Sequence, residues 1–371
     1  MAVLVVFVCP RPLVCLTEQM EVAIAMSGGV DSSVAAALLV EAGHEVTGVT
    51  LRLWGGVSDS GCCSASDVDD ARRVAQQLGI AHHVFNLTEE FQAAVVQPYI
   101  DGHAKGKTPN PCVECNRTVK FELLLERCRR LGFDRLATGH HARIVERNGV
   151  PKLARGVDDL KDQSYVLSML PASTIADLLL PVGEMQKSEV RERAVALGLR
   201  TAMKPDSQDV CFIRSDEGRE GFLGERLNVR PGTVIDRATG VQMGSVAAVQ
   251  LVTIGQRRGI GAGPDGERRY VVGVDLKRDV VEVAALEHAL QRRLKVLSSS
   301  MTTTGDALPL NTSVIVQVSA HGKPLSCVLE QASDGFDVVL DVPARLVAPG
   351  QTLAFYDVND PDIVLGSAIV A

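Results

Sequence analysis

A glycine- and serine-rich segment near the N-terminus, Ser27-Gly28-Gly29-Val30-Asp31-Ser32, constrains the fold of this chain more than any other stretch. The short apolar run Glu21–Met26 precedes it and is typical of a buried strand. An alanine- and leucine-rich stretch follows, and Gly43 ends that stretch as a glycine commonly ends a helix. Open α/β sheets bind ligands at such strand-to-helix loops, beyond the carboxyl ends of their strands. The segment therefore predicts a ligand-binding loop in an α/β domain.

Strands and helices continue to alternate after this first pair. The next expected strands are Glu45–Leu53, His82–Leu87 and Asp134–Thr138, and the expected helices are Asp67–Leu78, Glu89–Ala104, Arg117–Leu131 and Lys187–Leu197. Strands that alternate with helices of about ten or more residues predict βαβ units and a parallel sheet covered on both faces.

The pattern changes near residue 218, where short runs rich in glycine and valine replace the helices. The expected strands are Gly232–Asp236, Ala247–Thr253, Arg269–Asp275, Val314–Ser319, Ser326–Gln331, Phe336–Leu340 and Leu353–Tyr356. Short strands at close spacing predict β-rich modules. We interpret the stretch Arg292–Leu308, with its serine and threonine triplets, as the seam between two such modules.

Composition narrows the class of protein without identifying a partner. The 371 residues, of which 46% are hydrophobic and 22% charged, suit two or three globular domains. The net charge of −7 counts mildly against a nucleic-acid partner, but binding depends on local patches rather than on the total. Basic residues cluster locally at Lys105, Lys107, Arg117 and Lys120, at Arg127, Arg129 and Arg130, and at Arg257, Arg258, Arg268 and Arg269.

The cysteines and the N-terminal residues indicate in which cellular compartment the protein resides. Nine cysteines are an odd number and fit a disulfide framework poorly. The apolar residues 2–8 lack a preceding basic segment and are too short to span a membrane. We therefore expect a protein of the reducing cytoplasm, where cysteines serve as ligands, nucleophiles or core residues. Residues 1–19 are interpreted as an extension or as a start assigned too early, because Met20 directly precedes the first strand.

The chemistry of the loop suits a phosphate chain. Adjacent Gly28 and Gly29 let the backbone approach closely, the helix start offers N–H groups, and Ser27 and Ser32 add hydroxyl donors. Asp31 would repel phosphate unless it orients the loop or binds the magnesium ion of ATP. The pattern GxxxxGK[ST] is absent, so the loop is not of the Walker type. A plain turn capped by Asp31 or Ser32 is the alternative.

A proline-rich segment, Thr108–Asn116, carries two cysteines just before a predicted helix. Cys115 lies near the helix N-terminus, beside Arg117 and Lys120, and both effects favour its thiolate form. The spacing of Cys112 and Cys115 also fits a zinc site, a redox disulfide, part of an iron–sulfur site or two core cysteines.

A later segment, Asp206–Ile213, contains Cys211. Taken alone, Cys211 is more typical of a small buried residue than of a reactive one. Sulfur transfer would explain why the chain has two cysteines that lie far apart in the sequence. One holds a persulfide, and the other releases the sulfur by thiol exchange and is left in a disulfide bond.

The segment Ser27–Ser32 resembles the PP-loop of the ATP pyrophosphatases, which cleave ATP between its α and β phosphates and adenylate a substrate oxygen. With its further motifs, the chain from Met20 onward is similar to the tRNA-specific 2-thiouridylase family. These motifs are Thr108-Pro109-Asn110-Pro111, Cys115-Asn116, Lys120-Phe121, Ala137-Thr138-Gly139-His140-His141, Lys161-Asp162-Gln163-Ser164-Tyr165, Pro181-Val182-Gly183-Glu184, Asp206-Ser207, Cys211-Phe212-Ile213 and Ile254-Gly255-Gln256-Arg257-Arg258-Gly259-Ile260-Gly261. The PP-loop alone indicates activation and not substrate, whereas the ordered set of motifs is highly specific.

The resemblance implies an α/β fold. A parallel-sheet PP-loop domain (adenine nucleotide α-hydrolase-like) would be followed by a small β-rich central domain and a C-terminal β-barrel that contacts tRNA. Together with the change of pattern near residue 218, it implies an extension over 1–19, a catalytic domain over 20–217, a central domain over 218–294 and a barrel over 295–371.

The resemblance also implies a reaction and residue roles. Such enzymes use ATP with Mg²⁺ to 2-thiolate the wobble uridine in the anticodon loop of tRNA, and they release AMP and pyrophosphate. Cys211 would carry the persulfide, and Cys115 would be its nucleophilic partner. ATP would be held by Ala25, Met26, Ser27, Gly28, Gly29, Val30, Asp31, Ser32, Leu51 and Gly139. The target base would meet Asn110, Pro111 and Cys112, and the tRNA would meet His140, Lys161, Asp162, Gln163, Ala320, His321 and Gln351.

Two places depart from the family pattern. Many members have an aspartate where this chain has Cys112, and a thiol with a pKa of about 8.5 does not replace a carboxyl group with a pKa of about 3.9. Cys112, Cys115 and Cys211 could instead hold a [4Fe–4S] cluster, and that hypothesis stays open. Ser319-Ala320-His321-Gly322 stands where many members have a more basic and aromatic stretch, so its contribution to tRNA affinity is open as well.

Two other classes of function compete. Another PP-loop enzyme, forming lysidine on tRNA or an amide on a small molecule, would need no cysteine pair. A non-catalytic RNA-binding module with structural ATP would not turn ATP over. The expected partners are tRNA and a persulfide-donating sulfur carrier or cysteine desulfurase, without a membrane, and a monomer is expected by analogy.

Overall fold

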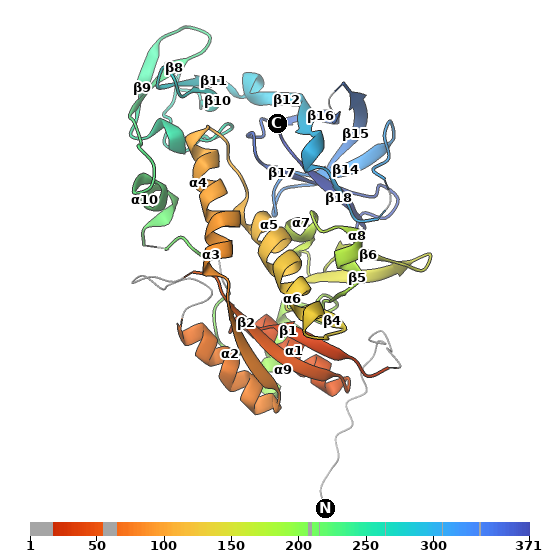
Figure 1. Ribbon diagram of the computed structural model, residues 1–371. Coiled ribbons are helices and arrows are strands. Elements are labelled where there is room, and N and C mark those ends of the chain that lie inside the picture. The colour runs from red at the N-terminus through yellow and green to blue at the C-terminus, as the bar shows by residue number, and fades with distance from the viewer. Residues whose placement is uncertain are drawn as a thin grey trace, which may run out of the picture.

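The computed structural model describes residues 18–54, 65–206, 210–214, 216–263, 265–305, 307–333 and 335–371. Most of the predicted extension and the motif residue Ser207 lie outside the described residues, as do Cys9, Cys15, Cys62 and Cys63. Within the described ranges the chain builds three sheets and a separate two-stranded hairpin (Figure 1). No helix in these ranges is both long enough and apolar enough to cross a membrane.

The N-terminal sheet is parallel and has the strand order β3-β2-β1-β4-β7. Its strands are β1 (Glu21–Ala25), β2 (Glu45–Arg52), β3 (Ala81–Asn86), β4 (Arg135–Thr138) and β7 (Leu178–Leu179). The helices on one face are α1 (Val30–Glu41), α2 (Ala65–Leu78) and α9 (Lys187–Ala196). Because alternate strand residues face opposite sides, Val22 and Ile24 pack against these helices, whereas Ala23 packs in the cluster on the other face. The predicted parallel sheet, covered on both faces, is confirmed.

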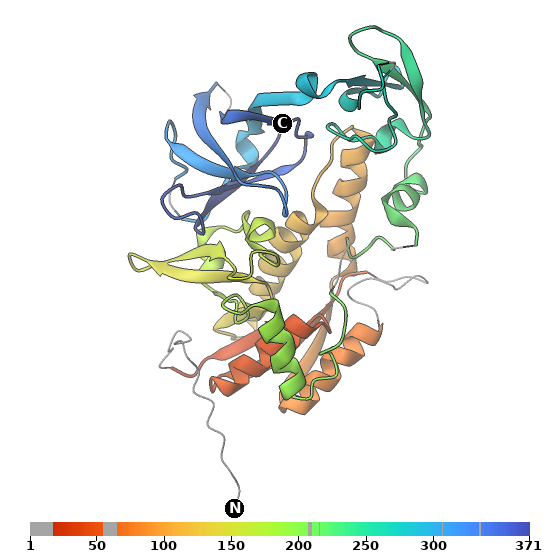
Figure 2. The same ribbon diagram turned by 180° about the vertical axis from the view of Figure 1, so that it is seen from behind.

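Two long helical rods cover that other face (Figures 1 and 2). One rod consists of α3 (Thr88–Phe91), η1 (Gln92–Val96) and α4 (Gln97–Ala104), and the other of α5 (Pro111–Glu114), η2 (Cys115–Leu123) and α6 (Leu124–Arg130). Both η1 and η2 are π-helical, a form that recurs at functional sites. The second rod starts earlier than predicted, so both cysteines of the proline-rich segment are helical.

The rest of the chain is rich in β-structure. The connecting elements are the hairpin β5 (Ala142–Arg147) and β6 (Val150–Arg155), the helices α7 (Ser164–Leu167), α8 (Ala172–Ile175) and α10 (Gly218–Gly224), and the short turn η4 (Leu286–Ala289). A four-stranded sheet contains β8 (Gly232–Asp236), β9 (Gln242–Val246), β10 (Tyr270–Asp275) and β11 (Val280–Ala284), in the order β10-β11-β8-β9. The β-rich character predicted for the later half of the chain is therefore confirmed, although α10 opens that half.

The C-terminal sheet is antiparallel and has the order β12-β16-β15-β14-β17-β18-β13. Its strands are β12 (Leu290–Leu297), β13 (Thr302–Thr303), β14 (Ser313–Gln317), β15 (Leu325–Ala332), β16 (Gly335–Arg345), β17 (Thr352–Tyr356) and β18 (Val364–Ile369), and η5 (Ser298–Ser300) follows β12. An isolated bridge joins Val296 in β12 to Val370 just after β18. The sheet therefore curls back on itself, as expected of a barrel-like module.

Two sequence predictions in this half are wrong. The strand expected over 247–253 is instead the turn η3 (Val249–Leu251), in which the buried Gln250 Oε1 accepts the Arg230 N–H at 3.0 Å. The apolar pattern there reflects a buried turn rather than a pleat. The seam expected over 292–308 begins inside β12, because residues of β12 up to Leu297 pair with β16.

The C-terminal sheet packs directly on the N-terminal half. The Tyr165 hydroxyl donates to Thr352 O at 2.9 Å, and the Arg155 guanidinium lies 3.8 Å from the centre of the Tyr356 ring. Gln351 Nε2 also donates a hydrogen bond to Thr108 O, the first carbonyl of the proline-rich segment. These contacts fix the sheet against α7, β6 and the segment that carries the two cysteines.

Candidate functional site

The phosphate loop leads from β1 into α1 and is tied down by its own hydroxyl groups. The Ser27 N–H donates to Ser32 Oγ at 3.2 Å, and Ser33 Oγ donates to Gly29 O at 2.7 Å. Gly29 precedes the first turn of α1, and no side-chain hydrogen bond caps that turn. The first N–H groups of α1 therefore suit an anion, as the loop chemistry predicts.

Two glycines are required because another backbone segment lies very close to each of them. Gly28 has a φ of +73°, and a Cβ atom there would lie 2.3 Å from Asp67 O. A Cβ atom on Gly139 would lie 2.5 Å from the Ser32 nitrogen. The loop is thus enclosed by α2 on one side and by the segment after β4 on the other, and larger residues would displace it.

Asp31 does not present an uncompensated charge to a phosphate. Its carboxylate accepts hydrogen bonds from Lys187 Nζ at 2.5 and 2.6 Å and lies 3.0 Å from His141 Nε2. Burial raises the pKa of Asp31, but the hydrogen bonds from His141 and Lys187 outweigh burial and leave the pKa below its ordinary value. Of the two roles that the sequence leaves open, this geometry supports orientation of the loop.

Lys187 extends this network to Asp206. Lys187 Nζ lies 3.0 Å from Asp206 Oδ1, and the same carboxylate binds Lys161 at 2.8 Å and Arg191 at 2.7 Å. Burial raises the pKa of Asp206, but the bonds from Lys161 and Lys187 lower it to about 2 overall. The sequence analysis missed Lys187 and Arg191. A lysine at the start of a helix, where the dipole disfavours a cation, was the signal that could have indicated a local purpose.

Some of the residues predicted to hold ATP are core residues. Met26 packs with α1 on one face of the sheet, and Leu51 packs in the cluster on the other face. Thr50 Oγ1 donates to Met26 O at 2.8 Å, so the carboxyl ends of β1 and β2 are joined. Val30 is buried in the first turn of α1, and Ala25 is half-buried at the end of β1. The structure brings the backbone of these residues together, but not the side chains of Met26 and Leu51.

His140 is held between the phosphate loop and the second rod. Its Nδ1 lies 2.7 Å from Thr138 Oγ1, and its ring lies 5.7 Å from that of Phe121, centre to centre. Burial, helped by the charges of Lys120 and His141, lowers the pKa of His140 to about 3. A contact with tRNA through His140 would therefore be made by a neutral imidazole.

The segment Lys161-Asp162-Gln163 is bonded mainly to the protein itself. Lys161 binds Asp206, and Gln163 Oε1 accepts the His141 N–H at 2.9 Å. The Asp162 side chain is 7% exposed and accepts hydrogen bonds from Arg155, Gly156 and Ser164. The segment therefore braces the strand-end residues beside the phosphate loop, and its contact with tRNA stays a prediction.

Asn110 begins the second rod and positions both of its cysteines. Its Oδ1 accepts the Cys112 N–H at 3.1 Å and so caps the helix. Cys112 lies exposed in the first turn, whereas Cys115 lies one turn further on and is 5% exposed. Arg117 is engaged with Glu114 at 2.8 Å. Cys115 therefore lies beyond the first helical turn, where the helix dipole acts most strongly.

Cys211 and Cys115 belong to one apolar cluster. Cys115 lies inside the cluster, and Cys211 packs half-buried against it. The neighbouring Phe212 ring packs edge-on against Phe91 and Tyr99, with centroids 5.7 and 5.6 Å apart. This packing holds the Cys211 segment against the first rod, in the same large cluster that contains Cys115.

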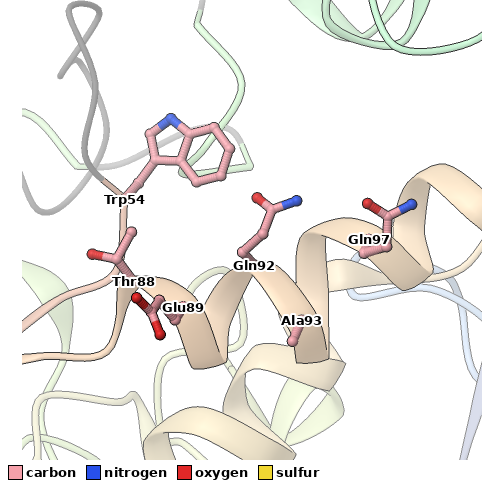
Figure 3. A pocket seen from close by; sticks show the side chains of 6 residues that line it. All are labelled: Trp54, Thr88, Glu89, Gln92, Ala93 and Gln97. Atoms are coloured by element: carbon pink, nitrogen blue, oxygen red, sulfur yellow. The ribbon is translucent and has the colours of Figure 1, made fainter.

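A cavity of about 480 Å³ opens beside this cluster. Its lining consists of Trp54, Thr88, Glu89, Gln92, Ala93 and Gln97 (Figure 3). The Trp54 ring lies 6.1 Å from that of Phe212, and Figure 3 shows the Gln92 and Gln97 amides on the same side of the rod as the indole. The cavity is therefore bordered by an aromatic ring that also packs on Phe91, Phe212 and Phe222. The sequence analysis gave Trp54 no role, although it is the only tryptophan of the chain.

Metal ligation finds little support in the described residues. They contain no group of three or more His, Cys, Asp or Glu side chains arranged to hold a metal ion. Cys112, Cys115 and Cys211 accordingly do not converge as three ligands in this structure. The hypothesis of a [4Fe–4S] cluster gains no support from their geometry.

The C-terminal residues predicted to contact tRNA fall in different places. Gln351 donates to Thr108 O, so it lies beside the segment that leads to Asn110. Ala320 packs against the apolar cluster that contains Cys115, and its carbonyl accepts a hydrogen bond from Gln317 Nε2 at 3.0 Å. His321 is exposed. Gln351 is therefore brought to the cysteine-bearing segment, and His321 stays at the surface.

Comparison with protein families covers nearly the whole chain. A family model described as the tRNA methyl transferase HUP domain matches residues 20–215. The tRNA methyl transferase PRC-barrel domain matches residues 220–285, and an aminomethyltransferase beta-barrel domain matches residues 294–370.

Curated relatives share a single name. The tRNA-specific 2-thiouridylase MnmA of Mycolicibacterium gilvum (strain PYR-GCK) is 46% identical over 365 residues, which cover 95% of this chain and 99% of that protein. The protein of the same name from Saccharopolyspora erythraea is 42% identical over 365 residues, again covering 95% and 99%. The chain belongs to the tRNA-specific 2-thiouridylase family. Membership in the 2-thiouridylase family confirms the resemblance drawn from the motifs, and the parallel N-terminal sheet confirms the fold class.

Solved structures add less to the 2-thiouridylase assignment. The U34-tRNA thiolase NcsA from Methanococcus maripaludis with its [4Fe–4S] cluster is 20% identical, covering 52% of this chain and 63% of that one, with a TM-score of 0.36. A likeness at this level carries no argument about cofactor or mechanism.

Proposed function

We propose that this chain uses ATP to 2-thiolate the wobble uridine of tRNA, with the domain limits expected from the sequence. Family membership supports the activity, and the enclosed phosphate loop supports the use of ATP. The observation that carries the sulfur chemistry is the packing of Cys115 and Cys211 in one apolar cluster. Cys128 shares that cluster, but burial raises its pKa to about 11, so it stays a protonated thiol.

The first step is activation of the base. The N–H groups of the first turn of α1, with Ser27 and Ser32, hold the phosphate chain of ATP, which binds as its magnesium complex. The uracil 2-oxygen attacks the α-phosphorus, and pyrophosphate leaves. Lys187 keeps the Asp31 charge compensated, so the phosphates meet no bare carboxylate. Adenylation is needed because a carbonyl oxygen is a poor leaving group and AMP is a good one.

The second step transfers sulfur. A donor protein or cysteine desulfurase first leaves a persulfide on Cys211. The terminal sulfur of this persulfide attacks C2 of the adenylated base and displaces AMP, which leaves the base bonded to Cys211 through two sulfurs. The Cys115 thiolate then attacks the Cys211 sulfur and breaks the sulfur–sulfur bond. The electron pair stays on the outer sulfur as the 2-thio group, and a dithiol reductant later reduces the disulfide between Cys115 and Cys211.

The base enters near the start of the second rod. Asn110, Pro111 and Cys112 form its edge of the site, and His140 with Lys161–Gln163 supports the tRNA on the other side. The wobble base lies in a single-stranded loop, so turning it into a pocket costs on the order of a few kcal/mol. An enzyme that meets tRNA and a sulfur donor in this way belongs in the cytoplasm.

A thiolation assay without iron tests the proposal. Protein purified in air with chelator and reductant is supplied with ATP, magnesium, a persulfide donor and unmodified tRNA, and the digested nucleosides are analysed by mass spectrometry. We expect 2-thiouridine, which would show that the cysteine persulfide suffices. If 2-thiouridine forms only under argon with a reconstituted cluster, the persulfide mechanism is wrong. If it forms under neither condition, the proposed function is wrong.

The two rival classes are separated by simple measurements. A different PP-loop enzyme would keep its activity in C211A, because lysidine or amide formation uses no thiol. A non-catalytic RNA-binding module would not convert ATP to AMP and pyrophosphate in the presence of tRNA. We expect loss of thiolation in C211A and tRNA-dependent release of pyrophosphate by the unaltered protein.

A further inference from the structure

The loop between the two helical rods touches both β-rich sheets. A Cβ atom on Gly106 would lie 3.3 Å from Leu276 Cδ1, in the turn between β10 and β11. A Cβ atom on Gly350, just before β17, would lie 3.3 Å from Lys107 Cβ. The loop therefore contacts both β-rich sheets immediately before Asn110, where the proposed base-binding edge begins.

Four exposed cations surround the contact between Gly106 and Leu276. Lys105 and Lys107 flank the glycine, and Lys277 and Arg278 directly follow the leucine. These residues are far apart in sequence, and only the contact between the β10–β11 turn and the loop gathers them. None of the four forms an ion pair within the part of the chain that the structure describes.

Within the described residues, the neighbouring carboxylates form no ion pair with these four side chains. Asp279 is paired with Arg230 at 2.9 Å, and Asp275 Oδ1 accepts the backbone N–H groups of Lys277 and Arg278 at 2.9 and 3.1 Å. These bonds shape the turn and leave the two side chains at its tip.

Other arginines of the same sheet behave differently from the four cations. Arg230, Arg237 and Arg269 each hold a carboxylate within 3 Å. In a chain whose net charge is −7, a gathering of cations without acidic partners stands out as a local positive surface.

We propose that Lys105, Lys107, Lys277 and Arg278 bind phosphates of the tRNA anticodon arm beside the wobble nucleotide. This inference rests on the proposed function, since it places the target base at Asn110. Flexible lysines contact phosphates as point charges and carry no sequence information, so the surface orients the RNA without selecting its sequence. Because the surface includes residues of the central sheet and of the catalytic half, both would contact the same RNA molecule.

Salt-dependent binding tests the surface with a matched control. The double variant K277A/R278A alters only the tip of the turn. The control R72A/R73A removes two adjacent exposed arginines of α2, of which Arg72 pairs with Asp69 at 2.8 Å, at the opposite end of the molecule (Figure 1). An unmodified anticodon stem-loop RNA is titrated at several salt concentrations. For K277A/R278A we expect about tenfold weaker binding at low salt and a salt slope smaller by about 1 to 2. We expect R72A/R73A to match the unaltered protein.

The outcomes separate this inference from the proposed function. Unchanged affinity and slope in K277A/R278A, with 2-thiouridine still formed by the unaltered protein, would overturn the inference alone. Absence of both binding and 2-thiouridine in the unaltered protein would overturn the proposed function. A loss seen with an acceptor-stem hairpin and not with the anticodon stem-loop would place the surface on another part of the tRNA and refute the assignment. Should K277A/R278A fold poorly, K277Q/R278Q and K105A give the same readout.

Discussion

The phosphate loop and the cysteine region both lie beyond the carboxyl ends of β1 and β2, but they are built in opposite ways. Around the loop, Asp31, Lys187 and Asp206 form a continuous chain of ion pairs. Around Cys211, the rings of Phe212, Trp54 and their neighbours make an apolar cluster. One half of the proposed reaction is therefore served by fixed charges and the other by apolar packing.

This difference follows from what each region has to do. A polyanion binds well to charges and N–H groups that are in place before it arrives, because reorganisation during binding would cost free energy. Sulfur exchange needs two thiols that meet, form a disulfide and separate again. Apolar contacts are non-directional, so the Cys211 segment can shift within its cluster more readily than a network of fixed charges can. Each region should accordingly fail in its own way when it is altered.

The largest expected effect separates the two regions by their chemistry. C211A or C115A should lower thiolation by about a thousandfold or more, because the transferred sulfur has no carrier or no release partner. The tRNA-dependent exchange of pyrophosphate into ATP should stay within about threefold, since activation uses the other region. The control C128A removes a buried thiol of the same cluster and should keep thiolation. Loss of pyrophosphate exchange in C211A would refute the assignment of activation and sulfur transfer to separate regions.

Altering the charge network should produce the reverse pattern. K187M removes the cation that holds Asp31 beside the phosphates, while Asp206 keeps Lys161 and Arg191. Exchange and thiolation should therefore fall together, by about a hundredfold. Breaking a largely buried ion pair should also lower the free energy of unfolding by about 3 kcal/mol in urea titrations. The double variant D31N/K187M removes both charges and should recover part of that stability. No recovery would mean that the pair does not act as a unit.

A glycine pair tests steric closure of the loop against backbone strain alone. G28A must fit a Cβ atom 2.3 Å from Asp67 O, so we expect a loss of about 3 kcal/mol in stability and weak ATP binding. Gly79 has a similar φ of +71°, but its Cβ position meets nothing within 4 Å. G79A should therefore cost only about 1 kcal/mol and keep ATP binding. Equal losses in the two variants would contradict the role of close approach.

The buried His103 and the half-buried His140 predict an acid-sensitive fold. Burial lowers the pKa of His140 to about 3 and that of His103 to about 4, whereas both titrate near 6.5 in the unfolded chain. Between these values the unfolded chain binds more protons, so stability falls as the pH drops below 6.5. Each histidine should cost about 2 kcal/mol between pH 6.5 and pH 5 in urea titrations. H140Q should remove the part of this pH dependence that His140 contributes. An unchanged pH profile of stability in H140Q would contradict that contribution.

The smallest effect is expected at the exposed end of the C-terminal sheet. His321 lies at the surface, so H321A should change tRNA affinity by less than about twofold at physiological salt. Gln351 bonds to the segment ahead of Asn110, and Q351A should weaken thiolation by several-fold by loosening that segment. Filter binding and the thiolation assay measure the two effects. An H321A effect larger than that of Q351A would reverse this ranking.

Local pattern was enough to predict much of the fold. The alternation of strands and helices up to residue 138 follows from periodicity and from glycines that end helices, and both depend only on neighbouring residues. The failure over 247–253 has the same origin. An apolar run of that length is buried in either conformation, and only the bonds of Gln250 to the backbone of Asn228 and Arg230 make it a turn.

The sequence by itself determined the parallel fold, the phosphate loop and the two important cysteine segments, because strand pattern, glycine positions and ordered motifs are properties of contiguous residues. Only the tertiary structure decided that Lys187 compensates Asp31, that Cys112 rather than Cys115 occupies the first helical turn, and that Trp54 borders a cavity. Ion pairs, helix starts and cavities depend on distances between segments far apart in the chain, and those distances are set by how the sheets and rods pack.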